Sequence, residues 1–446
     1  MTTLKAKVTR HLQDRDSHHR RIAVGFFWVS FFVFVGKLAG AAKEMTIAWR
    51  YGISGTVDAY VFIYNLISWP VGVWFSVLTV VLVPLVARMR RDEGSDISRF
   101  CGELLGLTLL IGLLLGLLLY WGLPSLLQAT WVGLADEVVA QALTMAGPLS
   151  FLLPMGLVIS LFSAWMMACG HHRNTLMEAL PALVILVAIL LPPGTIPEPL
   201  VWGTVAGFAL HLAGLAMPLK KMGELQAPSL IFTSPAWRGF WGSMGIMAIG
   251  HSLMSFTGII DQFFAAQLGT GAIATLSYAN RIMALVLGLG AMAISRATLP
   301  VFSDLVAGEA SPTVRGIAIR WAGAMFVVGL MATIAVWLLA PWIVSLLFER
   351  GSFTTDDTYT VSNLLRFYIL LLPFSFYGNV LVSFFAAQRH GINIFWGGIV
   401  AVLAKLIMNL LLVDIYQIYG LVYSAVFMYL STSVFLTIRI YMSRNL

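Results

Sequence analysis

Asp261 and Arg281 lie in the segment DQFFAAQLGTGAIATLSYANRI, in a chain in which only 11% of the residues are charged. The segment contains a Gly-Thr-Gly break, and strongly apolar residues flank it on both sides. An isolated charge in hydrocarbon costs about 2.5–3.5 kcal/mol, so a buried charge needs a partner or a water-filled cavity. An arginine in such a cavity presents a planar fork that suits carboxylate or phosphate groups. These two residues are therefore candidates for a polar binding site.

Other ionisable and amide side chains also lie inside apolar stretches. The candidates for contact with a ligand are Lys37, Lys43, Asp58 and Arg281, and those for supporting or coupling roles are Glu44, Asp261, Asn280, Arg366, Lys405 and Asn409. Basic residues outnumber carboxylates in this set, so a cavity lined by it would be net positive. Such a cavity favours an anion over a lipophilic cation.

Each candidate also has a purely structural interpretation. Lys43 and Glu44 are adjacent and would equally form an exposed ion pair near the outer interface. Arg296 and Arg366 lie near the ends of apolar stretches, where a long side chain reaches water. The structural alternative for the deeper residues Lys37, Arg281, Lys405, Asp58 and Asp261 is that they brace neighbouring helices.

The elements that must position these side chains are long and apolar. The chain has 446 residues, of which 59% are hydrophobic, and its mean hydropathy is +0.88. A soluble protein of this length would need far more surface charge. Stretches such as ELLGLTLLIGLLLGLLLYWGL at 103–123 are long enough to cross about 30 Å of hydrocarbon as a helix. The sequence therefore predicts an all-α, polytopic membrane protein.

We predict twelve transmembrane helices in two six-helix bundles. They cover approximately 22–50, 58–87, 98–121, 144–169, 175–193, 199–219, 238–267, 271–302, 316–348, 359–388, 393–413 and 419–441. The predicted division is a cytoplasmic N-terminal segment at 1–21, a first lobe at 22–219, a linker at 220–237 and a second lobe at 238–446.

Basic residues between the predicted helices give the orientation. They are Arg20, Arg21, Arg88, Arg90, Arg91, Arg173, Lys220, Lys221, Arg315, Arg389, Arg439 and Arg444. The loops on the opposite side, such as PPGTIPEP, have no lysine or arginine. Cytoplasmic loops carry the excess of basic residues, so both termini are expected in the cytoplasm. The basic, polar N-terminus does not have the pattern of a cleaved signal peptide.

The two predicted lobes show a weak repeat. KEMTIAWRYGISGTVDAYVFIYN in the first half corresponds in order to DQFFAAQLGTGAIATLSYAN in the second. Repeats with an even number of helices are parallel and related by an axis along the membrane normal. We therefore expect a V-shaped central cavity between the lobes, where transporters bind their substrates.

Other functional classes lack support in the sequence. There is no Walker motif, no Ser-His-Asp arrangement and no paired carboxylates placed for catalysis. Cys101 and Cys169 are far apart in sequence, and the turn GHHRN at 170–174 is typical of a solvated loop. The basic residues lie at helix ends, which fits membrane orientation better than nucleic-acid binding. We expect neither a metal nor a cofactor, and a transporter rather than an enzyme.

Several of these segments resemble the MurJ/MviN family of lipid II flippases, in the multidrug/oligosaccharidyl-lipid/polysaccharide (MOP) exporter superfamily. GKLAGAAKEMTIAWRYGISGTVDAY resembles its first-helix signature, and IIDQFFAAQLGTGAIATLSYANRIMALVLGLGAMAISRATLP resembles its seventh and eighth helices. LLFERGSFTTDDT at 346–358 is similar to its outer loop. The resemblance implies that Arg281 is the functional arginine and that Asp58 is the acid of the family's TDAF element.

The sequence also departs from that family. Asn280 replaces a common aspartate, Ile260 replaces a common arginine, and NLISWPVG occupies the place of an arginine pair. The predicted helix count of twelve is usual for the related Wzx-type flippases of O-antigen and exopolysaccharide units, whereas lipid II flippases have two more helices.

The resemblance implies a flippase for a polyprenyl-pyrophosphate-linked oligosaccharide in the bacterial inner membrane. Arg281, Lys37 and Lys43 would hold the pyrophosphate, while Asp58 and Asp261 would orient these cations or take part in coupling. Membrane lipids, and a polysaccharide polymerase or glycosyltransferases, would be its partners. The alternatives are a MATE-type, cation-coupled multidrug exporter and a non-transporting membrane scaffold for polysaccharide assembly.

Lys405 carries a prediction of its own. In sodium-coupled relatives, acidic and amide groups of the C-terminal lobe bind the ion. Lys405 and Asn409 are one helical turn apart, and the lysine would place an ammonium beside Asp261 where sodium would bind. We therefore expect no sodium binding in this lobe and a lysine that braces the helix at 393–413 against that at 238–267. The alternative is a lysine that faces water in the cavity.

Overall fold

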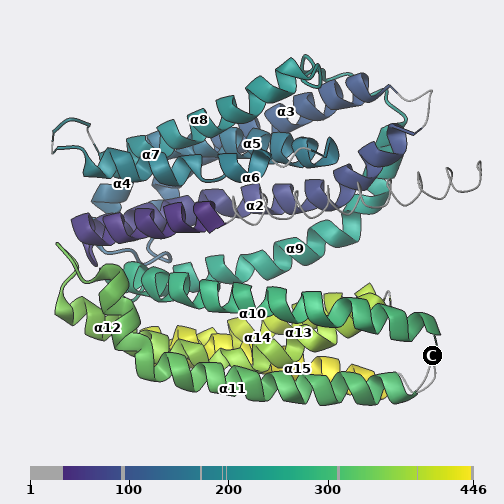
Figure 1. Cartoon of the computed structure of the whole chain (residues 1–446). Helices are drawn as coiled ribbons and strands as arrows, with labels where there is room; N and C mark the ends of the chain where they lie inside the picture. Colours follow the sequence, from purple (N-terminus) through teal and green to yellow (C-terminus); the bar gives the residue numbers. More distant parts are fainter. Residues whose placement is uncertain are drawn as a thin grey trace, which may run out of the picture. The chain divides into compact units, whose positions relative to one another are not determined.

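The computed structural model describes residues 34–91, 96–170, 173–192, 194–196, 198–308, 312–388 and 390–442. Across these ranges helices are joined by turns and irregular segments, and none of the described residues is in a strand (Figure 1). The predicted N-terminal segment at 1–21 lies outside the described residues, as do Arg389, Arg444 and the histidine pair at 171–172.

The helices agree with the predicted apolar stretches. Residues 34–51 are helical. The next helices are α2 (Gly55–Met89), α3 (Ile97–Leu127), α4 (Asp136–Ser150), α5 (Leu152–Ala168), α6 (Arg173–Met177), α7 (Leu180–Leu190) and α8 (Pro199–Lys221). They are followed by α9 (Ala236–Ala266), α10 (Ala272–Gly308), α11 (Pro312–Phe348), α12 (Thr355–Tyr368), η1 (Ile369–Leu371), α13 (Leu372–Ala387), α14 (Gly391–Tyr416) and α15 (Ile418–Met442).

Some predicted helices are interrupted. The stretch predicted as 144–169 consists of α4 and α5, which meet at an angle of 42°. The stretch predicted as 359–388 has a 3-10 turn at η1, directly before Pro373 in the first turn of α13. A proline lacks the amide that would continue the preceding helix, so a change of helical geometry beside it is expected.

The described part of the chain contains eight helices that are long and apolar enough to cross a membrane, or nine if α4 and α5 form one bent span. The prediction of an all-α, multi-pass membrane protein is confirmed. The shorter α7 has 11 residues, which gives it a length of about 16 Å, well below the bilayer thickness. The count of twelve spans and the two six-helix bundles stay predictions.

The chain forms two compact units. Of the described residues, those within 34–47, Val77–Gly116 and Phe151–Gly242 form the first unit, and those within Ala48–Ser76, Leu117–Ser150 and 243–442 form the second. In the first unit α7 packs against α8 at very short range, because a Cβ on Gly203 would lie 2.8 Å from the Cβ of Ala188. Small residues allow such close approach between membrane helices.

The predicted linker is held against α3 within the first unit. The Ser229 amide donates to the Gly102 carbonyl at 2.9 Å. The buried Glu103 carboxylate accepts from the Thr233 amide at 3.0 Å and from the Trp237 indole at 2.6 Å. The end of the linker and the start of α9 are therefore fixed to α3.

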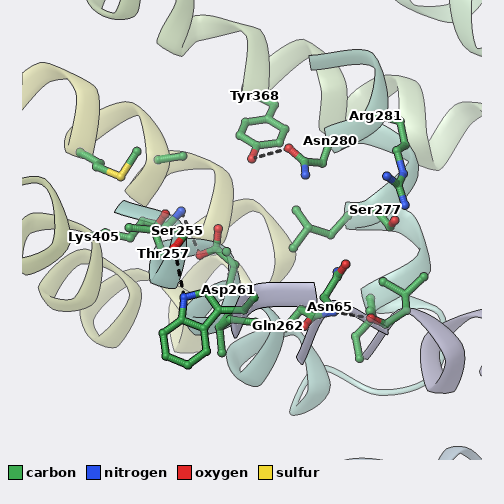
Figure 2. A pocket seen from close by; sticks show the side chains of 18 of the residues that line it. Asn65, Ser255, Thr257, Asp261, Gln262, Ser277, Asn280, Arg281, Tyr368 and Lys405 are labelled. Carbon is green, nitrogen blue, oxygen red and sulfur yellow. Dashed lines mark hydrogen bonds and ion pairs between the residues drawn. The ribbon is translucent and has the colours of Figure 1, made fainter. Parts of the chain in front are cut away.

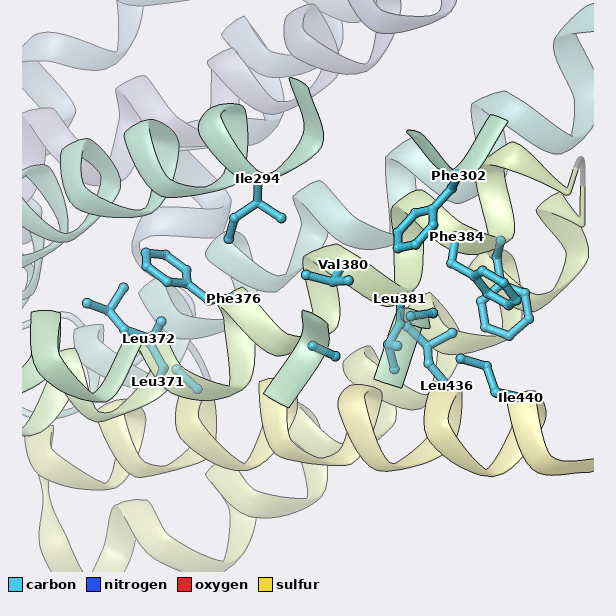
Figure 3. Close-up of a cluster of buried hydrophobic side chains, with 14 of the residues drawn as sticks. Ile294, Phe302, Leu371, Leu372, Phe376, Val380, Leu381, Phe384, Leu436 and Ile440 are labelled. Atoms are coloured by element: carbon cyan, nitrogen blue, oxygen red, sulfur yellow. The ribbon is translucent and has the colours of Figure 1, made fainter. Parts of the chain in front are cut away.

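The second unit has an aromatic-rich core. Figure 1 shows α11, α13, α14 and α15 side by side, in green to yellow. Phe302, Phe376, Phe384 and Leu381 are buried between α10, α13 and their neighbours (Figure 3). A Cβ on Gly290 would lie 2.2 Å from the Phe376 ring, so this glycine makes room for the phenylalanine. This packing joins α10 and α13 within the second unit.

Candidate functional site

A polar cavity of about 450 Å³ lies within the second unit. Segments of α2, α9, α10, α12, α14 and α15 contribute to its wall. Its polar and aromatic lining residues are Asn65, Ser68, Trp69, Ser255, Thr257, Asp261, Gln262, Ser277, Asn280, Arg281, Tyr368, Lys405 and Tyr429 (Figure 2). The volume is within the range of about 300–1,000 Å³ that is typical of small-ligand sites.

Lys405 and Asp261 form a buried ion pair at this cavity. The Lys405 Nζ lies 2.9 Å from Asp261 Oδ1 and also donates to the Leu421 carbonyl at 2.9 Å. Only 1% of Lys405 is exposed. The expected contact between Lys405 and Asp261 is confirmed, and it joins α14 to α9. Lys405 also belongs to the cavity wall, but its burial fits the bracing interpretation and not that of a lysine that faces water.

Asn409 extends this pair into a network. Its Nδ2 donates to Asp261 Oδ1 at 3.1 Å, and its Oδ1 accepts from the Ser424 hydroxyl. Lys405 and Asn409 lie one turn apart on the buried face of α14. The network therefore gives the Asp261 carboxylate a counter-charge and a hydrogen-bond donor from the same helix.

Basic side chains outnumber acidic ones among the described residues that line the cavity. The charged residues in this part of the wall are Asp261, Lys405 and Arg281. Asp261 is paired with Lys405, and Arg281 is the second basic group. Figure 2 shows Arg281 beside Ser277 and well separated from the Lys405–Asp261 pair. The arrangement suits an anionic ligand group at the Arg281 side.

Asn280 and Tyr368 lie between these two charged regions of the cavity (Figure 2). The Tyr368 hydroxyl donates to Asn280 Oδ1 at 3.3 Å, which connects α12 to α10. Sequence reasoning identified Asn280 but missed Tyr368, Tyr429, Asn65, Trp69 and Gln262. For Asn65 and Trp69, the sequence signal was the group of polar residues that interrupts the apolar run of α2.

Asp58 has a different environment from the one its candidate role would suggest. It is 1% exposed and is not among the cavity-lining residues. Its carboxylate accepts from the backbone amides of Gly271 and Ala274, the latter at 2.6 Å. These amides belong to the turn before α10 and to its first turn, so Asp58 caps this helix from α2. Both carboxylate oxygens of Asp58 are thus bonded to backbone amides, and neither faces the cavity. This position does not support the predicted contact between Asp58 and the substrate.

The remaining candidates lie elsewhere. Lys43 and Glu44 form a half-buried ion pair at 2.7 Å in the first unit, and the exposed Lys37 in that unit acts electrostatically on Glu178. Arg366 of α12 donates to the Trp337 carbonyl and to the Asn363 amide oxygen, both at 3.2 Å. Arg366 thus connects α12 to α11 and does not line the cavity.

Comparison with known proteins gives consistent matches. A family model described as "Lipid II flippase MurJ" matches residues 47–445. A relative named "Probable lipid II flippase MurJ" from Buchnera aphidicola subsp. Baizongia pistaciae is 21% identical over 385 residues, which cover 81% of this chain and 72% of that protein.

Two solved structures show the same fold. One, "Lipid II flippase MurJ, inward closed conformation", aligns with a TM-score of 0.80 at 18% identity and covers 93% of this chain and 87% of its own. The other, an inward-facing multidrug resistance MATE family transporter of the MOP superfamily, aligns with a TM-score of 0.74 at 16% identity. That alignment covers 92% of this chain and 94% of the transporter.

Proposed function

The chain belongs to the lipid II flippase MurJ family, and on this premise we propose that it moves a polyprenyl-pyrophosphate-linked glycan across the bacterial inner membrane by alternating access. The glycan is a lipid II-like head group or an O-antigen or exopolysaccharide repeat unit. It travels from the cytoplasmic to the outer leaflet, and both termini of the chain face the cytoplasm. Since no bond is made or broken, this is transport and not catalysis.

The observation that carries the proposal is the charge distribution of the cavity. Among the described lining residues the basic Lys405 and Arg281 outnumber the acidic Asp261, and Asp261 is paired with Lys405. A guanidinium forms two parallel hydrogen bonds to phosphate oxygens. We assign Arg281 to the pyrophosphate and propose that Lys37 adds positive charge along the route, whereas Lys43 is already paired with Glu44.

The same pair informs the proposal for coupling. The ammonium of Lys405 occupies a position surrounded by the Asp261 carboxylate and the Leu421 carbonyl. A monovalent cation would need these same oxygen atoms. We therefore propose that the second unit does not bind sodium, and that membrane potential or protons drive transport. A polysaccharide polymerase or glycosyltransferases would supply or consume the lipid-linked glycan.

A cation-coupled multidrug exporter is the rival with the same fold. Such an exporter needs an available carboxylate in a net negative cavity to attract lipophilic cations. Asp261, which is the carboxylate among the described lining residues, is engaged by both Lys405 and Asn409. This pairing favours the anionic substrate.

Reconstitution into liposomes tests the proposal. The purified chain should move a fluorescent lipid II analogue between leaflets, whereas uptake of the lipophilic cation ethidium should stay at the level of protein-free liposomes. Ethidium transport without lipid movement would establish the exporter instead. If the chain moves neither the lipid II analogue nor ethidium, the result contradicts the proposal and favours a non-transporting membrane scaffold.

A further inference from the structure

The cavity has a second wall whose chemistry differs from that around Arg281. Asn65, Ser68, Trp69 and Gly72 of α2 all line it. Their spacing of three, four and seven residues from Asn65 places them on one face of the helix. This face has two polar side chains, one large aromatic ring and no charge. It has no cationic side chain to pair with a phosphate.

Trp69 is fixed in place by its neighbours. The indole Nε1 donates to the Ser255 hydroxyl at 3.1 Å. The indole ring packs on Phe256 with a centroid separation of 5.1 Å and an interplanar angle of 56°. An aromatic ring that is already ordered loses little conformational entropy when a ligand binds to it. Trp69 is therefore preorganised as part of the cavity wall.

The surroundings of Trp69 leave space and hydrogen-bonding groups. One helical turn along α2 (i, i+3), a Cβ added to Gly72 would meet no atom of the described side chains within 4 Å. Asn65 and Ser68 present amide and hydroxyl groups on the same face. Next to this face of α2, Gln262 Nε2 donates to the Val61 carbonyl at 3.0 Å, which fixes the orientation of that amide. An aromatic face beside amides and a hydroxyl is suited to a polyol.

We propose that this wall binds the first sugar of the lipid-linked glycan, with the sugar ring stacked on Trp69 and its hydroxyls bonded to Asn65 and Ser68. The C–H face of a pyranose carries partial positive charge, and the indole face carries partial negative charge, so the two attract each other. The inference rests on the proposed function, because the pyrophosphate at Arg281 places the attached sugar inside the same cavity. A volume of about 450 Å³ suits this part of the head group and not a whole polymer.

A simple packing role for Trp69 against Phe256 predicts a different outcome from sugar stacking. Loss of packing would weaken the binding of every ligand through a disturbed cavity. Loss of a stacking surface would weaken only ligands that carry a sugar. Two lipids that share the polyprenyl pyrophosphate and differ in the glycan separate these roles.

The experiment compares the binding of lipid II and of undecaprenyl pyrophosphate to the purified full chain in nanodiscs. Trp69→Ala should lower the affinity for lipid II about five- to tenfold and leave that for undecaprenyl pyrophosphate unchanged. Trp69→Phe, which keeps an aromatic face, should retain most of the lipid II affinity. Trp342→Ala is the matched control, because Trp342 of α11 is 78% exposed and does not line the cavity.

The outcomes are distinguishable. An equal loss for both lipids in Trp69→Ala, or no loss for either, would overturn the sugar-stacking role while the proposed function stands. An equal loss in Trp69→Phe and Trp69→Ala for both lipids would identify a packing residue. Failure of the unmodified chain to bind either lipid would overturn the proposed function, and the inference with it.

Discussion

Asp58 and Asp261 are both carboxylates in apolar helices, and their partners give them different roles. Asp261 faces a cavity and pairs with the ammonium of Lys405. The carboxylate of Asp58 accepts hydrogen bonds from the backbone amides of Gly271 and Ala274. An acid in a membrane segment is therefore a candidate for function only until its partners are known.

Replacing Asp58 with alanine should destabilise the protein without directly removing a cavity group. The amides of Gly271 and Ala274 would lose their acceptor, at a cost of about 1–2 kcal/mol that is typical of a lost helix cap. Asp58→Asn should lose less, because its side-chain oxygen still accepts a hydrogen bond. Thermal unfolding in detergent measures the effect, with Asp414→Ala at an exposed position of α14 as the control. Equal melting temperatures for Asp58→Ala and the parent would contradict the capping role.

The Lys405–Asp261 pair predicts a non-additive response to mutation. Lys405→Ala leaves the Asp261 carboxylate buried without its counter-charge, which typically costs about 3–5 kcal/mol. Adding Asp261→Asn removes that charge, so the double variant should be more stable than Lys405→Ala alone. A double-mutant cycle from thermal unfolding provides the test. Additive losses would mean that the two side chains act independently.

The sequence allowed some of these residue roles to be predicted. A lysine inside the apolar run of α14 needs a partner of opposite charge or a water-filled cavity. Asp261 was the acid expected beside it in the predicted fold. The partners of Asp58 are backbone groups, which carry no side-chain signal. Trp69 and Asn65 are uncharged, so a search for charges in apolar helices did not find them.

At the level of the helices, α3 shows how a glycine pair positions a connecting segment. A Cβ on Gly106 would lie 2.1 Å from the Ser229 carbonyl oxygen, and one on Gly102 would lie 2.7 Å from that of Ala227. Glu103, between these glycines, accepts hydrogen bonds from the residues that lead into α9. The linker predicted at 220–237 is thereby attached to α3 along its second half.

Gly106→Ala should displace this segment. The added methyl group collides with backbone, and overpacking of this kind costs about 1–3 kcal/mol. Limited proteolysis should cleave the linker faster in the variant than in the parent. Gly122→Ala in the same helix is the matched control, because nothing lies within 4 Å of its added Cβ. Unchanged cleavage in Gly106→Ala would show that the linker is not held by this contact.

The long helices were predictable and their interruptions were less so. The apolar runs of α10 and α11 give clear hydrophobic signals, because each exceeds the length that a bilayer requires. The bend between α4 and α5 lies just before Pro154, and the 3-10 turn at η1 lies just before Pro373. A proline marks a possible break, but packing against neighbouring helices determines whether the helix bends or continues.

Two properties belong to the whole molecule: the substrate that it carries and the gradient that drives transport. Membership of the lipid II flippase MurJ family establishes the class of transporter. The buried ion pair supplies a fixed cation in the second unit. The substrate and the energy source can be measured separately, the first with Arg281 variants and the second by exchange of sodium for potassium.

Replacing sodium with potassium at constant membrane potential should leave transport unchanged. The Lys405 ammonium already satisfies the Asp261 and Leu421 oxygen atoms, so sodium has no equivalent site there. Lipid movement in liposomes is measured in both salts, with valinomycin and matched potassium gradients holding the potential. A clear loss of activity without sodium would refute the proposal that Lys405 takes the place of a sodium ion.

The most direct measurement for the central claim is lipid movement by Arg281 variants in liposomes. Arg281→Ala should reduce the flipping of a lipid II analogue to the protein-free level, with normal yield and unfolding temperature. Arg281→Lys should recover only part of the activity, because a point charge replaces a guanidinium that binds two phosphate oxygens at once. Full flipping activity in a correctly folded Arg281→Ala variant would contradict the assignment of this cavity to the pyrophosphate.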